Sequence, residues 1–567
     1  MANPRIYLWI AVALLLWMNL VQWNRDYGGR AGPAAPAATT PVAAQPETGS
    51  AAPADASLPE LPALPSTQTP TAAAPSDVPS PAAPAQTAAS RVRVITDVLD
   101  VDISLSGGNL VRADLLAYPH DKQPSSPPVR LLDTHEVTYN VDRTGLRALN
   151  AESEPNHLAK FTTPAQEFRL APGASELRVP LIWTDGAGIT VTKTFVFRRG
   201  RYDVELAYQV DNRSEAEWSG ASYVQLVRHI VKQKRSMFDV ESYAYRGPAV
   251  FDGRSYRKLN IEDEDDAAFA QGVTDGWIAS LQHHFVSAAV PPKGEEYHFT
   301  LTREGEHSVL SYRGPLKAVP AGTTGRLNET LFVGPKLQDQ LRAVGPKLER
   351  TADYGKLTIL AEPLFWLLQK VHGIIGNWGW AIIIVTFLLK LLFYKLTATS
   401  GRSMAKMRTI APRIKSIQER YKDDREQLAR QTMELYKREK VNPVAGCLPI
   451  LVQIPVFLAF YWVLLESVEM RQAPFLGWIQ DLSSKDPYFV LPILMGAAMF
   501  GQFKLNPAPP DPMQARIFAF MPVVMTVMMA WFPAGLVLYW ITNTLLSIAQ
   551  QWRINKVVEA EAAKSRS

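Results

Sequence analysis

Long apolar runs lie near both ends of the chain, whereas its middle alternates apolar and polar positions. An uncharged run at 6–23 is followed much later by five apolar segments, at about 378–396, 445–465, 488–503, 516–532 and 534–552. A helix of about 18 residues is roughly 27 Å long, which is enough to cross the hydrocarbon core of a bilayer. The pattern therefore predicts six transmembrane helices.

The first apolar run, within residues 1–27, is predicted to be an uncleaved membrane anchor. A cleaved signal peptide is the alternative, but its apolar core is usually about 7–15 residues long and is followed by small residues. Here the run leads into Gln22, Trp23 and Asn24. Residues 28–90 are rich in Ala, Pro, Thr and Ser and have almost no aromatic residues. They are predicted to be a disordered linker, because they cannot bury enough apolar surface to offset the entropy of ordering.

Residues 91–345 show the period of two that is typical of half-buried strands. Alternating runs and the turn signals between them occur at 101–105, 106–109, 185–188, 190–197 and 202–206. Such alternation gives each sheet one buried and one solvated face. This region is predicted to be a large antiparallel β-sandwich.

Residues 355–376 are predicted to form a short amphipathic helix in the membrane interface. Pro363 suits a first helical turn, and Gly373 and Gly376 separate the helix from the next span. The apolar face is expected to comprise Leu364, Phe365, Leu367, Leu368, Val371, Ile374 and Ile375. The alternative is that this segment is simply part of the following span.

The segment 398–442 is predicted to be a hairpin of two helices. Spacings of three and four residues give the first helix an apolar seam, formed by Met407, Ile410, Ile414, Ile417 and Tyr421. A turn at 422–424 precedes a second helix at about 425–440.

Loop charges predict the orientation of the spans. Residues 398–442 hold 12 Lys and Arg against 6 Asp and Glu, whereas residues 468–487 hold two basic residues against three acids. The positive-inside rule places the first loop in the cytoplasm and the second outside. Alternation then places residues 91–345 outside and both termini in the cytoplasm. The five-helix core is expected at 377–555 and a cytoplasmic tail at 556–567.

The composition of the chain excludes several kinds of binding and catalytic site. The chain has 567 residues, a formal net charge of +5 and a single cysteine, Cys447, so disulfides within the chain and cysteine-based metal sites are excluded. The basic residues flank apolar spans, as expected for lipid headgroups rather than for a specific nucleic acid. No phosphate-binding loop, nucleophile elbow or His–Glu–His metal spacing occurs, and His283 and His284 would point to opposite faces of a strand. We expect no cofactor and a protein that is not an enzyme.

Polar residues inside the apolar segments are the candidate functional positions. Thr386 and Lys390 lie four residues apart and share one helix face. A charge within a span is costly and usually faces a wet cavity, and the alternative is that Lys390 snorkels to the headgroups. For Gln453, Gln502 and Asn543 the alternative to a functional role is hydrogen bonding between helices.

Several motifs in the last third of the chain are specific in combination. They lie at 403–408 (SMAKMR), 437–443 (KREKVNP), 446–449 (GCLP), 453–457 (QIPVF), 469–475 (EMRQAPF) and 531–540 (WFPAGLVLYW). In this order, over about 355–555, the chain resembles the YidC family of membrane protein insertases. Its anchor, linker, outer domain and five-span core resemble the Gram-negative branch of that family.

The resemblance implies a periplasmic all-β supersandwich joined to a membrane α-helical bundle in the bacterial inner membrane. It also implies an insertase and chaperone that moves nascent transmembrane segments from the cytoplasm into lipid through a hydrophilic groove, alone or with the Sec translocon. The implied partners are nascent membrane proteins, the Sec translocon, membrane lipids and, weakly through the short tail, the ribosome.

The resemblance further implies three groups of site residues. The substrate groove would contain Lys390, Thr386 and Gln453, and the substrate slide Ile454, Phe457, Tyr539 and Trp540. The cytoplasmic hairpin would contribute Met404, Lys406, Met407, Arg408, Asp423 and Asp424. The groove cation of the family is often Arg, so Lys390 is a departure that keeps the charge but loses the planar fork.

Two other functions compete with this interpretation. A secondary transporter with Lys390 as a proton or anion site would show internal repeats, and the sequence has none. A membrane-tethered sugar-binding protein would need carboxylates and aromatic rings in one cleft, which the sequence leaves open.

Overall fold

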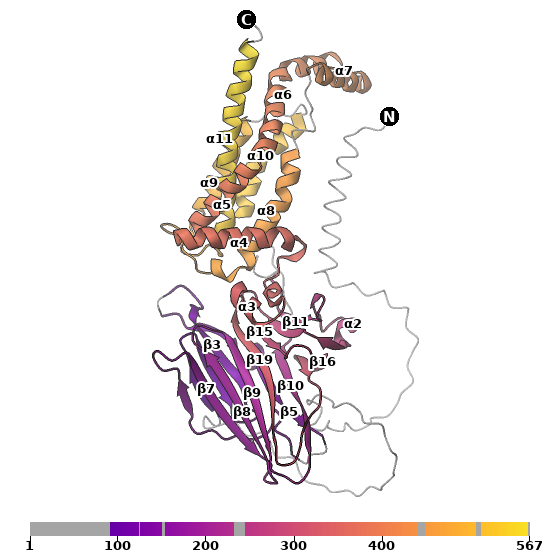
Figure 1. Cartoon of the computed structure of the whole chain (residues 1–567). Helices are drawn as coiled ribbons and strands as arrows, with labels where there is room; N and C mark the ends of the chain where they lie inside the picture. Colours follow the sequence, from indigo (N-terminus) through magenta and orange to yellow (C-terminus); the bar gives the residue numbers. More distant parts are fainter. Residues whose placement is uncertain are drawn as a thin grey trace, which may run out of the picture. The chain divides into compact units, whose positions relative to one another are not determined.

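The structure is a computed structural model, and it describes residues 91–564 apart from 124, 150–152, 232–243, 423, 440–447 and 506–511. The chain divides into two compact units, 1–58 and 59–567, and every described residue belongs to the second. The predicted anchor at 1–27 and linker at 28–90 therefore lie outside the described residues. The described chain forms a β-sandwich followed by a helical region (Figure 1).

Two sheets make up the sandwich, as the alternating pattern predicts. Their strand pairs are antiparallel, with β1 and β6 as the parallel exception. The 11-stranded sheet follows the order β13 (Ala270–Thr274), β16 (Glu296–Glu304), β17 (His307–Arg313), β10 (Trp218–His229), β5 (Asn140–Ala148), β3 (Asn109–Pro119), β2 (Leu99–Ser104), β1 (Arg91–Ile95), β6 (Glu167–Arg169), with β18 (Lys317–Val319) on β10 and β4 (Pro128–Leu132) on β3. The 8-stranded sheet follows the order β12 (Tyr256–Lys258), β11 (Gly247–Phe251), β14 (Trp277–Leu281), β15 (Phe285–Val290), β19 (Thr324–Pro335), β9 (Asp203–Asn212), β8 (Ile189–Arg198), β7 (Glu176–Thr184). Two short helices accompany the sheets, α2 (Glu264–Ala267) and α3 (Gln338–Val344).

The predicted turns lie where the strands meet. The turn at 106–109 joins β2 to β3, and the turn at 185–188 joins β7 to β8. Gly107 and Gly108 have φ values of 84° and 59°, a left-handed conformation that glycine adopts without steric cost. The turns that the sequence predicts at these two places are thus confirmed.

A lysine is buried between the sheets at a position where the strand pattern places an apolar residue. Lys193 on β8 has no exposed surface, and its Nζ donates hydrogen bonds to the carbonyl oxygens of Gly107 and Thr144, both at 2.9 Å. The rings of Phe195 and Tyr208 lie with their centroids 5.5 and 5.6 Å from the Nζ. Burial lowers the pKa of Lys193 well below its ordinary value. The two carbonyls belong to the large sheet and its turn, so this lysine links the two sheets.

Two buried carboxyl groups link the sheets as well. Asp142 on β5 accepts hydrogen bonds from the hydroxyl of Ser287 on β15 at 2.8 and 2.7 Å. Glu329 on β19 accepts hydrogen bonds from the hydroxyls of Ser222 on β10 and Tyr312 on β17. Burial raises the pKa of each carboxyl group to about 7. Such groups hold their proton more tightly in the folded than in the unfolded chain.

Glu329 gives a pH-dependent prediction. A folded-state pKa above the unfolded one contributes stability that is complete at low pH and is lost as the pH rises through about 7. The stability of the wild-type sandwich relative to Glu329→Gln is therefore expected to fall between pH 4.5 and pH 7, by at most about 3 kcal/mol. Pulse proteolysis of the full chain across a urea series, repeated at each pH, measures this difference. A difference that is constant over this range contradicts the prediction.

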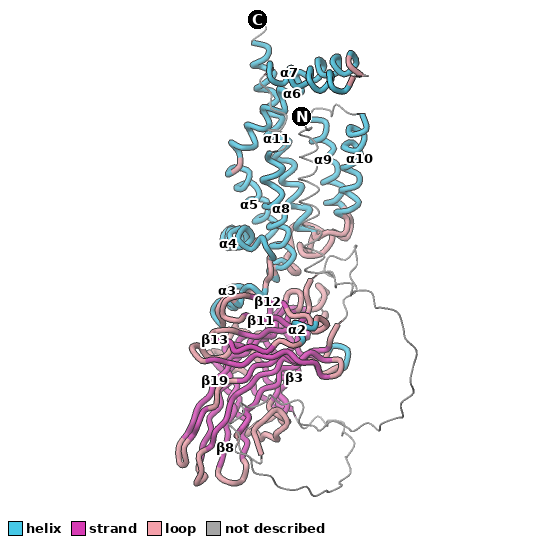
Figure 2. Tube along the Cα trace, turned by 90° about the vertical axis from the view of Figure 1, so that its right-hand side faces the viewer, coloured by secondary structure: helices cyan, strands magenta, loops and turns pink. Residues whose placement is uncertain are grey.

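The helical region follows the sandwich. It contains α4 (Thr358–Ile375), α5 (Trp378–Leu392), α6 (Tyr394–Arg420), α7 (Arg425–Arg438), α8 (Leu448–Glu466), α9 (Val490–Leu505), α10 (Pro512–Met529) and α11 (Ala534–Lys564). Helix α4 lies across the ends of the longer helices, which run roughly alongside one another (Figures 1 and 2). The buried face of α4 packs on α5 and α8 through Leu364, Phe365 and Leu368.

The structure corrects several expectations about the helices. Pro363 is the sixth residue of α4 rather than part of its first turn, because the helix begins at Thr358. Ile374 and Ile375 are 87% and 40% exposed, so part of the expected apolar face of α4 does not pack against the other helices, and its place in the membrane interface stays a prediction. The segment at 378–396 is interrupted: Phe393 leaves the helical conformation between α5 and α6, whose axes differ by 70°.

Two further expectations change at the ends of elements. Helix α11 continues to Lys564, because no Pro or Gly follows Trp552, and the expected tail at 556–567 is therefore helical in its described part. His283 and His284 lie in the loop between β14 and β15 rather than on a strand, and their rings stack at 3.8 Å instead of pointing to opposite faces.

Candidate functional site

The cation of the predicted groove lies between α5 and α11. Lys390 is in the last turn of α5, and its Nζ donates a hydrogen bond to the hydroxyl of Ser547 on α11 at 2.8 Å. Ser547 in turn donates to the carbonyl of Asn543 at 2.7 Å. Within the described part of the chain, Lys390 forms no ion pair with a carboxylate, and Ser547 is its side-chain hydrogen-bond partner.

The other two predicted groove residues are placed differently. Thr386 is 1% exposed, and its hydroxyl donates to the carbonyl of Ile382 one turn earlier at 2.6 Å. Gln453 is half-buried on α8 and, among the described residues, has no hydrogen bond to Lys390 or Thr386. In the structure, therefore, Lys390 forms its hydrogen bond with Ser547 and not with Thr386 or Gln453. Sequence reasoning missed Ser547, because a lone serine in an apolar helix commonly bonds its own backbone.

Three of the four predicted slide residues come together. The ring of Phe457 on α8 lies edge-on to that of Trp540 on α11, with centroids 4.7 Å apart, and 5.9 Å from that of Tyr539. Edge-to-face contacts of this kind are favourable beyond the area that they bury. Ile454 lies three residues before Phe457 on α8 and is 48% exposed. The aromatic contact joins α8 to α11 next to an exposed apolar side chain.

The predicted hairpin is present as α6 and α7. Ile410 and Ile414 of α6 pack against Leu435 and Tyr436 of α7, with Met407 and Ile417 at the edge of the cluster. Tyr421 ends the helix at its C-cap instead of continuing this seam. Asp424 begins α7, where its carboxylate accepts hydrogen bonds from the backbone amides of residues 426 and 427.

The remaining predicted hairpin residues are distributed around α6. Lys406 is exposed and Met404 is half-buried. Asp423 and the side chain of Arg408 lie outside the described part of the structure. The hairpin thus has a small apolar core and a basic, solvated exterior.

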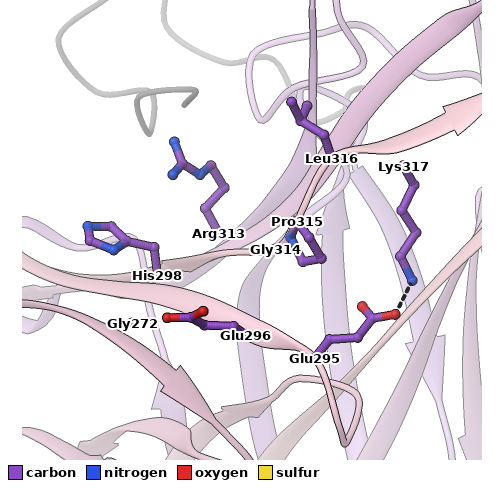
Figure 3. A pocket seen from close by; sticks show the side chains of 9 residues that line it. All are labelled: Gly272, Glu295, Glu296, His298, Arg313, Gly314, Pro315, Leu316 and Lys317. Carbon is purple, nitrogen blue, oxygen red and sulfur yellow. Dashed lines mark hydrogen bonds and ion pairs between the residues drawn. The ribbon is translucent and has the colours of Figure 1, made fainter. Parts of the chain in front are cut away.

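The sandwich carries a pocket of about 590 Å³ that bears on the sugar-binding alternative. It is lined by Gly272, Glu295, Glu296, His298, Arg313, Gly314, Pro315, Leu316 and Lys317 (Figure 3). Glu295 forms an ion pair with Lys317 at 2.8 Å, and His298 lies directly opposite Arg313 on the neighbouring strand. No Phe, Tyr or Trp belongs to this lining, so the pocket lacks the aromatic platform expected of a sugar-binding cleft.

Among the described residues, no helix on its own has both the length and the hydropathy of a membrane span. The pair formed by α5 and the first half of α6 has both, across its 70° bend. Three shorter apolar helical stretches lie at 452–466, 490–505 and 516–529. The number of six spans stays a prediction.

Comparisons with known proteins match nearly the whole described chain. Residues 91–367 match the model of the YidC periplasmic domain, and residues 370–561 match that of the 60Kd inner membrane protein. A membrane protein insertase YidC of Thioalkalivibrio sulfidiphilus is 46% identical over the full length of both chains. The chain belongs to the YidC family.

A second relative and one solved structure were also compared with this chain. The membrane protein insertase YidC of Nitrosococcus oceani is 44% identical and covers 99% of this chain and 100% of its own length. A crystal structure of an active YidC insertase with its first transmembrane domain resolved has 17% identity and a TM-score of 0.35, and it covers 81% of this chain and 92% of its own. YidC proteins are inner-membrane insertases with a periplasmic domain, and insertion is not an enzymatic reaction. The expectation of a protein that is not an enzyme is confirmed.

Proposed function

We propose that this YidC protein inserts nascent transmembrane segments into the inner membrane through a groove that contains the Lys390 charge. In this proposal α5, α8, α9, α10 and α11 form the membrane core at 377–555, residues 1–27 are the anchor and residues 91–345 are periplasmic. Both termini and the α6–α7 hairpin at 398–442 are cytoplasmic, and α4 within 355–376 lies in the interface.

Exposed apolar side chains support a lipid environment for the helical region. On α9, Ile493 is 61% exposed, and on α10, Phe520 and Val527 are 63% and 56% exposed. Contiguous exposed apolar surface on a soluble protein would be a liability, whereas lipid solvates it without cost. The excess of basic residues in the α6–α7 hairpin supports its cytoplasmic placement.

The observation that carries the proposal is the position of the Lys390 ammonium. It lies between two apolar helices, with a serine hydroxyl as partner and no carboxylate within ion-pair distance in the described chain. A charge left without a counter-charge creates a positive potential that attracts acidic groups. The acidic outer flank of an entering segment would supply the missing negative charge for a short time.

The mechanism follows from the cost of moving polar groups through lipid. Each unsatisfied polar group in hydrocarbon costs several kcal/mol, and a hydrated recess partway across shortens the apolar path. The apolar part of the segment then moves into lipid along Ile454, Phe457, Tyr539 and Trp540. Burial of that apolar surface away from water supplies the driving force, at about 25 cal/mol per Å².

The proposed groove and hairpin also indicate which partners this protein would bind. Nascent membrane proteins are the clients. We propose that the exposed basic face of the hairpin, including Lys406, meets anionic lipid or an acidic partner. The short tail would contact the ribosome weakly, and the Sec translocon would cooperate in insertion. Thr386 and Gln453 are proposed to support the walls of the groove rather than to contact the client directly, since Thr386 is buried.

Photo-crosslinking tests the substrate path. A photoreactive amino acid at position 454 on α8 is expected to crosslink a ribosome-bound nascent chain that carries one transmembrane segment. The same probe at position 493 on α9 is the matched control, because that side chain is equally apolar and more exposed, at 61% against 48%. Crosslinking is expected to be at least about fivefold stronger at position 454. Equal crosslinking at both positions would rule out a path along α8.

A further inference from the structure

The chain that follows α8 inserts directly into the sandwich. Helix α8 ends at Glu466, and Val468, two residues later, is 1% exposed and belongs to the apolar core of the sandwich rather than to that of the helices. Its neighbour Ser467 donates a hydrogen bond to the carbonyl of Val463 and lies 3.3 Å from the hydroxyl of Tyr354. The residues directly after α8 thus contact both the helix itself and the sandwich, and the place where the two meet is called the junction below.

A loop of the sandwich caps α8. The Nε2 of His283 donates a hydrogen bond to the carbonyl of Leu465 at 3.1 Å. The last carbonyls of a helix have no partner within the helix and need an external donor when they are buried. His283 supplies one such donor from the loop between β14 and β15, and the stacked ring of His284 supports it.

Two nearly buried ionisable groups lie at the ends of elements that meet at this junction. Glu466 at the end of α8 is 6% exposed, and Lys336, directly after β19, is 3% exposed. Burial lowers the pKa of Lys336 to about 8, and the carboxylate of Glu466 acts in the opposite direction.

The segment is anchored a second time at the end of β3. The guanidinium of Arg471 donates to the carbonyls of Pro119 and His120 at 2.9 and 3.0 Å. The amide of Gln472 donates to the carbonyl of Pro119 at 2.9 Å. The guanidinium also lies over the ring of Phe285, 5.5 Å from its centroid. Residues 466–472 therefore contact the sandwich at two separate places.

We propose that residues 466–472 are a latch through which the sandwich positions α8 for the entering segment. The latch holds the outer end of the helix that carries the exposed Ile454 and the partly buried Phe457, so it sets where the slide lies relative to α9. This inference rests on the proposed function, because it assigns the sandwich a positioning role in that same insertion step.

Spin-label distances test the latch directly. Labels at positions 454 and 493 are introduced into the full chain with Cys447→Ser, and their distance distribution is measured in lipid vesicles. The double variant Arg471→Ala with Gln472→Ala removes the hydrogen bonds to the end of β3 and leaves Val468 in the sandwich core. The distribution is expected to broaden about twofold, because α8 loses one of its two fixed contacts. Insertion is expected to fall about threefold through the misplaced slide.

The controls separate the latch from the groove. Arg178→Ala, an exposed change on β7, is expected to alter neither the distribution nor insertion, and Arg471→Lys is expected to restore part of both. A distribution of unchanged width in the double variant overturns the latch, whatever happens to insertion. Lys390→Ala is measured in parallel: wild-type insertion in that variant overturns the groove mechanism, while the distance distribution still decides on the latch.

Discussion

Lys390→Ala is expected to reduce the insertion of a client with an acidic outer flank by at least about tenfold, which corresponds to about 1.4 kcal/mol in the barrier. The ammonium is the positive group that the structure places between α5 and α11, and Ser547 alone does not replace its charge. Lys390→Met, which keeps the length and loses the charge, is expected to behave like Lys390→Ala. Lys390→Arg is expected to insert like the wild type, because attraction of an acidic flank requires a charge and not a particular shape.

The measurement is protease protection of a small membrane protein in cells depleted of the host insertase and complemented with each variant at equal expression. Lys395→Ala is the matched control, since Lys395 is five residues away and exposed. A client with a neutral outer flank should respond less than one with an acidic flank. Equal insertion by wild type, Lys390→Ala and Lys390→Met would mean that the lysine only snorkels and that hydration of the groove suffices.

Lys193→Ala is expected to cause the largest loss of stability in the sandwich. The change leaves a cavity and removes the hydrogen-bond donor from two buried carbonyls, those of Gly107 and Thr144. The cavity costs about 2–5 kcal/mol and each unsatisfied carbonyl about 1–3 kcal/mol. A loss of about 4 kcal/mol would lower the Tm of a domain of this size by roughly 10 °C.

Pulse proteolysis of the full chain over a temperature or urea series measures this loss. Lys193→Met fills the space without the donor, so its loss should be smaller and should isolate the two hydrogen bonds. Lys160→Ala, on the exposed surface of the same domain, is expected to leave the stability unchanged. If Lys193→Met is as stable as the wild type, the hydrogen bonds to the carbonyls contribute nothing net, as is known for some buried polar groups.

The sequence pattern predicts those elements whose formation depends on residues close to one another along the chain. Alternation and turn chemistry predict β8, β9 and the turn at 185–188 that precedes β8, and spacings of three and four predict the packing of Ile410 and Ile414 in the α6–α7 hairpin. The resemblance to the family supplied Phe457 and Trp540, which meet in the structure. These features depend on neighbours along the chain or on motifs that the family shares.

Features set by contacts distant in sequence could not be predicted. Lys193 sits on a buried face of β8, where a lysine ordinarily indicates solvent, because its carbonyl partners come from another sheet. Ser547 is 157 residues from Lys390, and nothing in its local pattern marks it as a partner. The break at Phe393 has no Pro or Gly to announce it, and the insertion of Val468 into the sandwich depends on the packing of the whole domain.

Helix α11 runs without a break from Ala534 to Lys564, 31 residues or about 46 Å. In the proposed topology this helix crosses a bilayer core about 30 Å thick, so about a third of it would project beyond that core. Ser547, which accepts the hydrogen bond of Lys390, lies on the same continuous helix as that projecting end. In the proposed topology, a partner that tilts this projecting end would therefore also move Ser547 and its hydrogen bond with Lys390, without any contact at the groove itself.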